Sequence, residues 1–263
     1  MIARGLMHLH TRASKDAELT FEEYVAFARR EGLAFLLFAE HRHRMTGEEV
    51  RETAAHCDAL STGDLLLVPG QEQQTDAPGK LHVLALGVRE PLAVTDPVGA
   101  VREIRERGGL AVFAHPARYD RDRYEAILAE VDGIEGWNMR YDGRVGVRES
   151  NRALLAERPS VLALAGVDAH RREDLEDPRA PRLVVELDRL DEPSLLAALR
   201  AGAFRVECAG ETLELRRRAA AFRRWHAGAM RLAFRGLRGI HRRLARLGIR
   251  LPERWVRAIR RRF

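Results

Sequence analysis

Cysteine, lysine and long apolar runs are all scarce in this chain of 263 residues. Two cysteines, Cys57 and Cys208, are too few for a disulfide framework, so we expect a reducing compartment such as the cytoplasm. No apolar run approaches the roughly 18 residues that a membrane-spanning helix requires. The first residues also lack the apolar stretch of a signal peptide. The sequence therefore predicts a cytoplasmic protein without a spanning helix.

The rest of the composition is that of a folded protein. Hydrophobic residues make up 46% of the chain and charged residues 32%. That hydrophobic share excludes disorder along the whole chain, because enough apolar surface is available to bury. A chain of this length can form one domain with a substantial core.

The net charge of +6 conceals two oppositely charged parts. Residues 216–263 contain 17 arginines, no lysine and one acidic residue, Glu253, so this segment carries a formal charge of +16. The remainder of the chain carries −10. This division predicts two functional parts, a domain over residues 1–213 and a basic tail over residues 214–263.

Short apolar runs alternate with helix signals over residues 1 to about 210. The runs predict seven strands, at 6–10, 34–41, 65–72, 82–88, 110–115, 133–138 and 161–170. Thr20 with Glu23 and Thr46 with Glu49 fit the capping box, and Asp96 precedes a proline at a helix start. Further helices are expected near 121–130, 146–157 and 192–201. The alternation predicts an α/β fold with a mainly parallel sheet, and seven strands suit a closed barrel as well as an open sheet.

Histidines and carboxylates occupy the ends of these predicted strands. The residues that share this setting are His8, His10, His41, Glu72, His115, Asp168 and His170. Side chains at the carboxyl ends of parallel strands converge on one face of an α/β barrel. Buried imidazoles and carboxylates are costly without a partner, and together they are ligands that suit Mn²⁺, Fe²⁺ or Zn²⁺. The pattern therefore predicts a metal cluster.

The order of these motifs resembles a known family. "MHLHTRASKDAELTFEEYVAFARREGLAFLLFAEHRHRM" is similar to a His-x-His-Thr start followed by a helix and a strand ending in Thr-Asp-His. "LVPGQEQQT" and "KLHVLALGV" resemble a Gly-x-Glu motif and the histidine strand after it. "AVFAHPAR", "GIEGWN" and "AGVDAH" resemble a His-Pro motif, a Glu-x-x-Asn strand and a closing Asp-x-His. Over residues 5 to about 208, the chain resembles the PHP (polymerase and histidinol phosphatase) domain of metal-dependent phosphoesterases.

This resemblance implies a distorted (β/α)7 barrel with two or three divalent metal ions, here followed by a basic helical extension. The implied ligands are His8, His10, Asp16, His41, Glu72, His82, His115, Asp168 and His170. Asp16 follows His10 by six residues, within the spacing usual for the family's ligand at this place. The implied catalytic residues are Glu72 as a bridging carboxylate, with Asp168 and His170.

Two features distinguish the chain from the family pattern. Ala39-Glu40-His41 replaces Thr-Asp-His, so Glu40 is expected to orient His41 through a longer arm. Asn138 of the Glu-x-x-Asn strand is a second supporting residue. The short spacings from Glu72 to His82 and from Asn138 to Asp168 leave no room for an inserted lid domain, which predicts an open site.

The resemblance implies hydrolysis of a phosphomonoester or a short nucleotide-like phosphodiester by a metal-activated water. Residues that follow strand ends are candidates for contacts to the phosphorylated small molecule or oligonucleotide, namely Arg118, Arg140, Arg144, Arg171 and His43. One alternative is a metal-dependent amidohydrolase. The only lysines, Lys15 and Lys80, do not end a strand, which disfavours a carbamylated lysine bridge. Another alternative is a non-catalytic metal-binding barrel that acts through its tail.

The basic tail allows three interpretations. Its arginines are interleaved with Phe222, Trp225, Phe234 and Trp255. Residues 216–263 suit an amphipathic helix on an anionic membrane, which would place the protein on the inner membrane face. They also suit a nucleic-acid-binding arm, or a helical hairpin packed on the acidic barrel. We favour the membrane.

Overall fold

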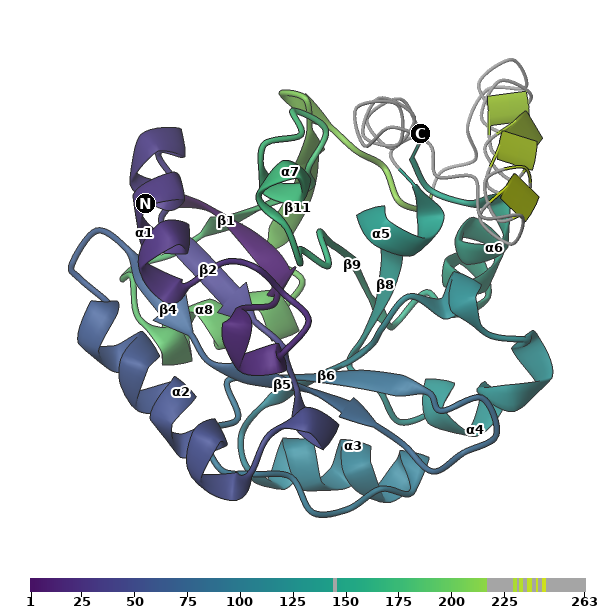
Figure 1. Ribbon diagram of the computed structural model, residues 1–263, viewed down its shortest axis with the longest axis horizontal. Coiled ribbons are helices and arrows are strands. Elements are labelled where there is room, and N and C mark those ends of the chain that lie inside the picture. Colours follow the sequence, from purple (N-terminus) through teal and green to yellow (C-terminus); the bar gives the residue numbers. More distant parts are fainter. Residues whose placement is uncertain are drawn as a thin grey trace.

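The computed structural model describes residues 1–143 and 146–216, together with 229–230, 232–233, 236–237, 240 and 243–244. Strands and helices alternate along the chain, as expected for the α/β class (Figure 1). In the view of Figure 1 the strands occupy the centre and helices such as α2 and α3 lie outside them. Arg144 and most of the basic tail lie outside the described residues.

All seven predicted strand regions form strands, two of them split by a single residue. In chain order the strands are β1 (Ile2–Leu9), β2 (Phe35–Phe38), β3 (Glu40–His41), β4 (Leu66–Val68), β5 (Gly70–Gln74), β6 (His82–Leu86), β7 (Leu110–Phe113), β8 (Gly133–Asn138), β9 (Leu162–Gly166), β10 (Arg182–Glu186), β11 (Phe204–Cys208) and β12 (Glu211–Thr212). The last three strands were not predicted. They extend one sheet beyond β1, with β10 antiparallel to it.

The helices follow most of the sequence signals. The α-helices are α1 (Phe21–Glu31), α2 (Gly47–Leu60), α3 (Pro97–Glu106), α4 (Glu125–Leu128), α5 (Met139–Asp142), α6 (Glu149–Glu157), α7 (Arg172–Leu175) and α8 (Glu192–Arg200). Short 3-10 helices are η1 (Arg12–Ser14), η2 (Arg42–Arg44), η3 (Pro116–Arg118) and η4 (Arg121–Arg123). Both predicted capping boxes form, and Asp96 caps α3 ahead of its proline.

The strands form two six-stranded sheets, ordered β12-β11-β10-β1-β2-β4 and β3-β5-β6-β7-β8-β9. The pairs β1–β2, β2–β4, β3–β5, β7–β8 and β8–β9 are parallel. The strand β6 departs from the expected direction, because it runs antiparallel to both β5 and β7. The reason is its short connection, since residues 75–81 suffice for an antiparallel turn but not for a crossover. This reversal places His82, the first residue of β6, opposite Gln74 at the end of β5.

The start and end of the strand series come together. The Val167 amide donates to the Met7 carbonyl at 3.0 Å, and the Ala169 amide donates to the His8 carbonyl at 3.2 Å. These bonds join the segment after β9 to β1. A mixed α/β architecture with parallel strands is thus confirmed, whereas the closed (β/α)7 barrel stays a prediction that these contacts favour. The division into residues 1–213 and 214–263 also stays a prediction.

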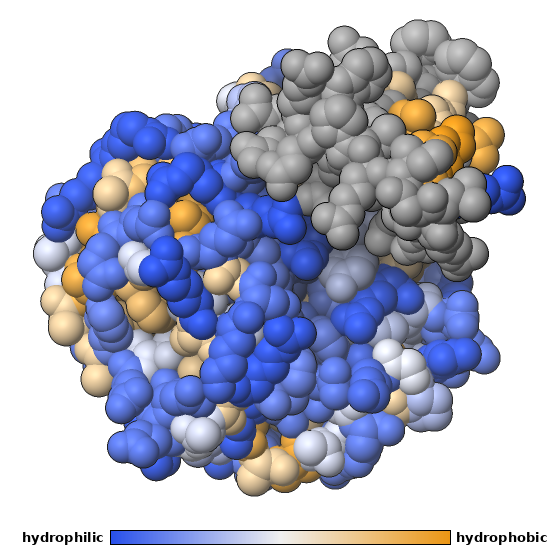
Figure 2. Space-filling model, in the orientation of Figure 1, coloured by the Kyte–Doolittle hydropathy of each residue, from blue (hydrophilic) through white to orange (hydrophobic). Residues whose placement is uncertain are grey.

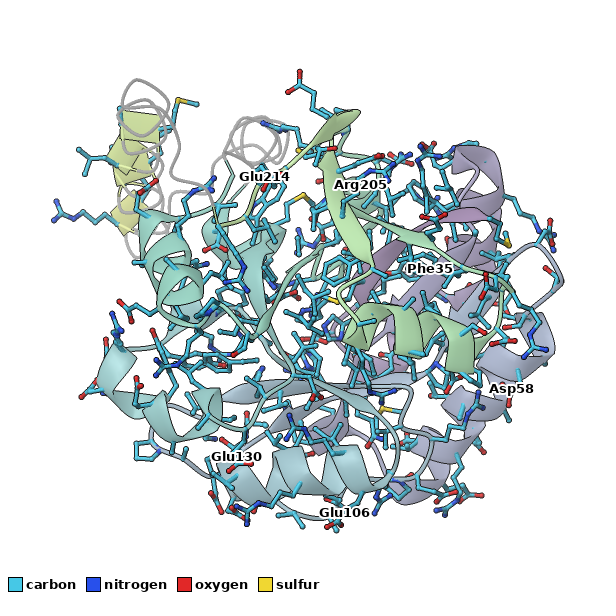
Figure 3. All side chains as sticks on the ribbon, turned by 180° about the vertical axis from the view of Figure 1, so that it is seen from behind. Phe35, Asp58, Glu106, Glu130, Arg205 and Glu214 are labelled. Carbon is cyan, nitrogen blue, oxygen red and sulfur yellow. The ribbon has the colours of Figure 1, made fainter. Side chains whose placement is uncertain are left out.

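Apolar side chains fill the space between the strands and the helices. Phe35, Phe38 and Trp137 are among the largest fully buried residues. Seen from behind in Figure 3, Phe35 lies within the molecule, whereas Asp58 and Glu106 lie on outer helices. Burial of apolar surface on this scale is the main stabilising contribution to such a domain. It gives the polar cluster described next a rigid support.

Candidate metal centre

The structure brings all nine predicted ligands together. Each of them has a side-chain nitrogen or oxygen within 4.0 Å of such an atom in another member, the widest of these contacts being 3.9 Å. Eight of the nine are buried, and Asp16 is the exception, with 29% of its side chain exposed. They come from β1, from the residues on either side of η1, from β3, β5 and β6, and from the segments after β7 and β9.

Glu72 lies at the centre of the cluster. Its Oε1 is 2.6 Å from His82 Nδ1 and 2.8 Å from His115 Nε2. Its Oε2 is 2.8 Å from His41 Nδ1 and 3.6 Å from His10 Nε2. A carboxylate that faces several imidazoles with both oxygens is arranged to bridge cations.

Asp168 faces the cluster from the opposite side. Its Oδ1 lies 3.3 Å from His170 Nδ1 and 3.6 Å from His10 Nε2. Its Oδ2 accepts a hydrogen bond of 3.2 Å from the side-chain amide of Asn138, which brings this expected supporting residue into contact with the cluster. Asp16 lies farther out, with Oδ2 3.4 Å from His41 Nε2 and 3.6 Å from His170 Nε2.

Two imidazole nitrogens show that the donor set fits metal ions. The Nε2 atoms of His8 and His10 are buried without a hydrogen-bond partner. They lie 3.6–3.9 Å from oxygens of Glu72 and Asp168, beyond hydrogen-bonding distance. Two ligand atoms about 2.1 Å from one ion lie roughly 3.0–3.4 Å apart, close to this spacing. Buried nitrogen and oxygen lone pairs that face one another without a partner would destabilise the folded state, unless a cation lay between the nitrogens and the oxygens.

Three overlapping groups could each hold an ion. They are His8, His10 and Asp168; His8, Glu72 and His115; and His10, His41 and His170, each with ligand atoms within 4.8 Å of one another. The groups share His8 and His10, so neighbouring ions would be close. The sharing is consistent with a cluster of two or three cations rather than separate sites.

Three of the candidate ligands have a strained backbone conformation. His8, His115 and Asp168 have φ values of 65°, 32° and 55°, in the left-handed region that residues other than glycine seldom adopt. At His8 the pairing of β1 with β2 shifts register between Met7 and Leu9. Simple alternation along one strand would place His8 and His10 on the same face. The structure instead uses a bulge at His8, and His10 follows the end of β1. Such strain concentrates at functional sites.

Glu135 is a residue of the site that the sequence interpretation missed. Its Oε1 accepts a hydrogen bond of 2.8 Å from His8 Nδ1, and its Oε2 accepts from the His115 amide and the Asn138 side chain. A carboxylate behind an imidazole fixes which nitrogen faces the metal. Gly166 makes room for it, because a Cβ there would lie 2.0 Å from Glu135 Oε1. The signal was present, since Glu135 is the first residue of the Glu-x-x-Asn motif.

Glu40 reaches the ring of His10 through Ser14, and through the same hydroxyl it reaches the backbone amide of His41. Its carboxylate accepts hydrogen bonds from the Thr11 amide and from the Ser14 hydroxyl. The Ser14 Oγ in turn lies 3.1 Å from His10 Nδ1. Glu40 therefore acts on the imidazole of His10 through Ser14, because its arm points toward η1 rather than toward the His41 ring.

The electrostatics of the cluster depend on burial and on the mixture of charges. Burial opposes protonation of His8, but Glu135 and Asp168 outweigh it and raise its pKa well above the ordinary value. Burial lowers the pKa of His10, helped by His170 and His41. Burial also acts to raise the pKa of Glu72 and of Asp168, but the surrounding histidines prevail and lower both. The centre thus holds two ionised carboxylates at neutral pH.

The predicted substrate-contacting residues fall in different places. Arg118 lies at the cluster, with Nη1 3.4 Å from His82 and its guanidinium over the rings of Tyr119 and Tyr141. His43 is exposed, and its ring lies 5.5 Å from that of His41. Arg171 is exposed and its Nε lies 3.5 Å from Glu18.

Two further arginines complete this comparison. Arg140 is exposed on α5. Arg44 was not predicted, but its Nη1 lies 3.2 Å from Asp16 Oδ2. Its position directly after the strand that ends in His41 was the available signal.

Comparison with solved structures places this geometry in a known fold. A two-domain protein from Bacteroides vulgatus that contains a predicted PHP-like metal-dependent phosphoesterase matches with a TM-score of 0.62 at 17% identity, over 79% of this chain and 65% of that one. The chain has the PHP-like fold. The chain spans just under two thirds of the length of that protein.

Two other solved structures match this chain at lower similarity. The lesion-specific endonuclease PfuEndoQ from Pyrococcus furiosus matches with a TM-score of 0.50 at 16% identity, over 78% of this chain and 58% of that one. An amidohydrolase from Chromobacterium violaceum, solved with sulfate and no metal, matches with a TM-score of 0.50 at 18% identity, over 79% of this chain and 98% of that one. No protein-family model and no curated protein matches the sequence.

Proposed function

We propose that this chain is a metal-dependent phosphoesterase that hydrolyses a phosphomonoester or a short nucleotide-like phosphodiester. The observation that carries the proposal is the pair of unpartnered Nε2 atoms of His8 and His10, aimed at the oxygens of Glu72 and Asp168. The PHP-like fold of a predicted phosphoesterase and the similarity to an endonuclease favour phosphoester chemistry.

The nine clustered side chains would hold two or three ions of Mn, Fe or Zn. Glu72 would bridge, His8, His10 and Asp168 would complete one site, and His82 and His115 a second. Asp16, His41 and His170 would form a third. Oxygen and nitrogen donors without a thiolate suit all three metals. When bound, such ions acidify a water molecule and offset the charge that develops on the phosphoryl oxygens.

The residues of the chain itself would bind and orient the substrate. Arg118 is preorganised between Tyr119 and Tyr141, and no carboxylate pairs with it among the described residues. Its planar guanidinium can therefore form a bidentate contact with a phosphate. His170 donates through Nδ1 to the Asp168 carbonyl, so its Nε2 can bind a third ion or, with only two ions bound, exchange a proton with the leaving group.

An amidohydrolase activity is the competing proposal, because one structure of similar fold is named an amidohydrolase. The described residues offer no lysine at the cluster for a carbamylated bridge. Lys15 is exposed and pairs with Glu49 at 3.1 Å, and Lys80 is exposed in the loop before β6. Glu72 occupies the central position instead, which favours the phosphoesterase. A non-catalytic metal-binding barrel is the third possibility. The following experiment distinguishes the three.

The test measures metal content and turnover together. Purified protein loaded with Mn²⁺ or Zn²⁺ should retain two or three ions per chain and hydrolyse 4-nitrophenyl phosphate or bis(4-nitrophenyl) phosphate. The variants His8→Ala and Asp168→Ala should lose both properties. His56→Ala is the matched control, because His56 is a surface histidine that pairs with Glu22. Hydrolysis of amide substrates alone would favour the competing activity, and metal uptake without turnover of any substrate would leave the non-catalytic barrel.

We propose, as a second function, that the basic tail acts at a membrane surface. Leu232, Leu237 and Ile240 are exposed by 71%, 37% and 55%, and orange surface appears in this part of Figure 2. Exposed aliphatic side chains in an arginine-rich segment suit the interface of an anionic bilayer, where both they and the arginines find partners, whereas binding to nucleic-acid phosphates would use the arginines alone. Their exposure also argues against packing on the barrel. Among the described residues, no helix combines the length and apolarity that crossing a bilayer demands.

Vesicle binding tests this second proposal. The full chain should sediment with vesicles that contain phosphatidylglycerol and much less with purely zwitterionic vesicles. The double variant Leu232→Glu and Ile240→Glu should reduce sedimentation, whereas Ile2→Glu, at a residue that is 59% exposed outside the tail, should not. Unchanged binding of the double variant, together with tight binding to duplex DNA, would assign the tail to nucleic acid.

A further inference from the structure

Ser14 occupies a junction between two of the candidate ligands. Its Oγ lies 3.1 Å from His10 Nδ1 and accepts a hydrogen bond of 2.9 Å from the His41 backbone amide. The hydroxyl donates to Glu40 Oε2. Ser14 and Glu40 are both fully buried, so water does not replace these contacts.

The hydrogen bonds of this hydroxyl can be accounted for completely. A hydroxyl has one proton to donate and two lone pairs that accept. The hydroxyl proton is donated to Glu40. The backbone amide of Thr11 also donates to this carboxylate, at 2.9 and 3.1 Å from its two oxygens. One lone pair accepts from the His41 amide, so the remaining lone pair faces His10 Nδ1. His10 must then carry its proton on Nδ1, and its Nε2 presents a lone pair to the cluster.

The backbone of His10 is fixed separately. The Tyr24 hydroxyl donates to the His10 carbonyl at 2.9 Å, and the His10 amide donates to the Ala169 carbonyl at 3.1 Å. Ser14 and Glu40 are therefore not needed to hold the chain of His10 in place. What they set is the rotation of its ring and the location of its proton.

We propose that Glu40 and Ser14 are positioning residues that fix the tautomer of His10 and so set the cation affinity of the cluster. The proposal rests on the proposed metal site. It assigns a role to the glutamate that stands where the resembled motif has aspartate. A glutamate reaches both the Thr11 amide and the Ser14 hydroxyl, and its negative charge is what directs the Ser14 proton away from His10.

The variant Glu40→Gln tests the direction of the hydrogen bonds with almost no change of shape. The amide group of glutamine can donate to Ser14 Oγ, which turns the hydroxyl proton toward His10 Nδ1 and moves the imidazole proton to Nε2. Ser14→Ala removes the relay altogether. Both variants should bind Zn²⁺ or Mn²⁺ about 10- to 100-fold more weakly, as is typical for residues that orient a metal-bound histidine.

Two measurements make the test decisive. Long-range ¹H–¹⁵N NMR of the metal-free protein should show His10 protonated on Nδ1 in the wild type and on Nε2 in Glu40→Gln. Equilibrium titration with Zn²⁺ against a competing chelator should show the loss of affinity. Glu103→Gln is the matched control, because Glu103 is also a buried glutamate that accepts from backbone amides, those of Ala93 and Val94.

The outcomes separate this inference from the proposed function. An unchanged His10 tautomer and unchanged Zn²⁺ affinity in Glu40→Gln would overturn the relay while leaving the metal site intact. A wild type that takes up no metal would overturn the proposed function, while the NMR comparison would still decide the tautomer. An equal loss of affinity in Glu103→Gln would show that the effect is general destabilisation and would also overturn the relay.

Discussion

The imidazole of His8 and the carboxylate of Glu135 form a buried pair, with Nδ1 and Oε1 2.8 Å apart. Neither side chain is exposed to solvent. The pair joins β1 to β8 and leaves the Nε2 of His8 facing Glu72 and Asp168. Because a carboxylate can only accept, the contact fixes the proton of neutral His8 on Nδ1.

Replacement of Glu135 by glutamine should therefore impair the cluster. The two oxygens of Glu135 accept from three donors, so an amide NH₂ would face at least one of them. We expect metal affinity to fall about 10- to 100-fold, measured by Zn²⁺ titration. Asp132→Asn is the control, since this acidic residue just before β8 accepts from the Ala111 amide away from the cluster. Wild-type affinity in Glu135→Gln would contradict the role given to the pair.

Metal binding should depend steeply on pH. Glu135 and Asp168 overcome the effect of burial and raise the pKa of His8 above its ordinary value of 6.5, so a proton competes with the metal at this residue even near neutrality. Affinity should increase as pH rises through the raised pKa, and binding should release protons. Calorimetry in buffers of different ionisation enthalpy measures that release. Affinity that is constant from pH 6 to 8 would show that His8 is not a ligand.

Arg118 should contribute to substrate binding rather than to metal binding. Arg118→Ala should lower kcat/KM about 10- to 100-fold, the effect typical for losing a charge-assisted hydrogen bond to phosphate. Arg118→Lys should recover only part of it, because lysine lacks the planar fork. Steady-state kinetics with metal analysis checks both points. Arg51→Ala serves as control, since Arg51 is exposed and pairs with Glu90. Equal activity of the two alanine variants would remove Arg118 from the site.

Gly166→Ala should disturb the cluster from behind. The added Cβ would lie 2.0 Å from Glu135 Oε1 and 2.8 Å from His8 Cβ, so both residues would have to move. Overpacking of this kind costs about 1–3 kcal/mol, which thermal unfolding would detect together with weaker metal binding. Gly63→Ala is the matched control, because a Cβ at Gly63 would meet nothing within 4 Å. Unchanged thermal stability of Gly166→Ala would show that Glu135 and His8 can move away from the added methyl group without cost.

The gathering of the nine candidate ligands was predictable from sequence, because chemically distinctive residues stand at the ends of apolar runs. The direction of β6 was not, since periodicity describes a strand but not its neighbour. Glu135 and Ser14 were missed for a related reason. Their contacts, to His8 across 127 residues and to Glu40 across 26, depend on tertiary structure rather than on local pattern. The bulge at His8 could not be predicted either, because a histidine in the sequence does not indicate a left-handed backbone conformation.

The reversal of β6 also has a consequence for how the site assembles. Glu72 and His82 are ten residues apart and belong to one hairpin, so their meeting requires only a short loop to close. His8 and Glu135 meet only when remote parts of the chain have joined. A partly folded chain that has formed this hairpin would thus contain two of the nine clustered side chains, and tight cation binding would indicate that folding is complete.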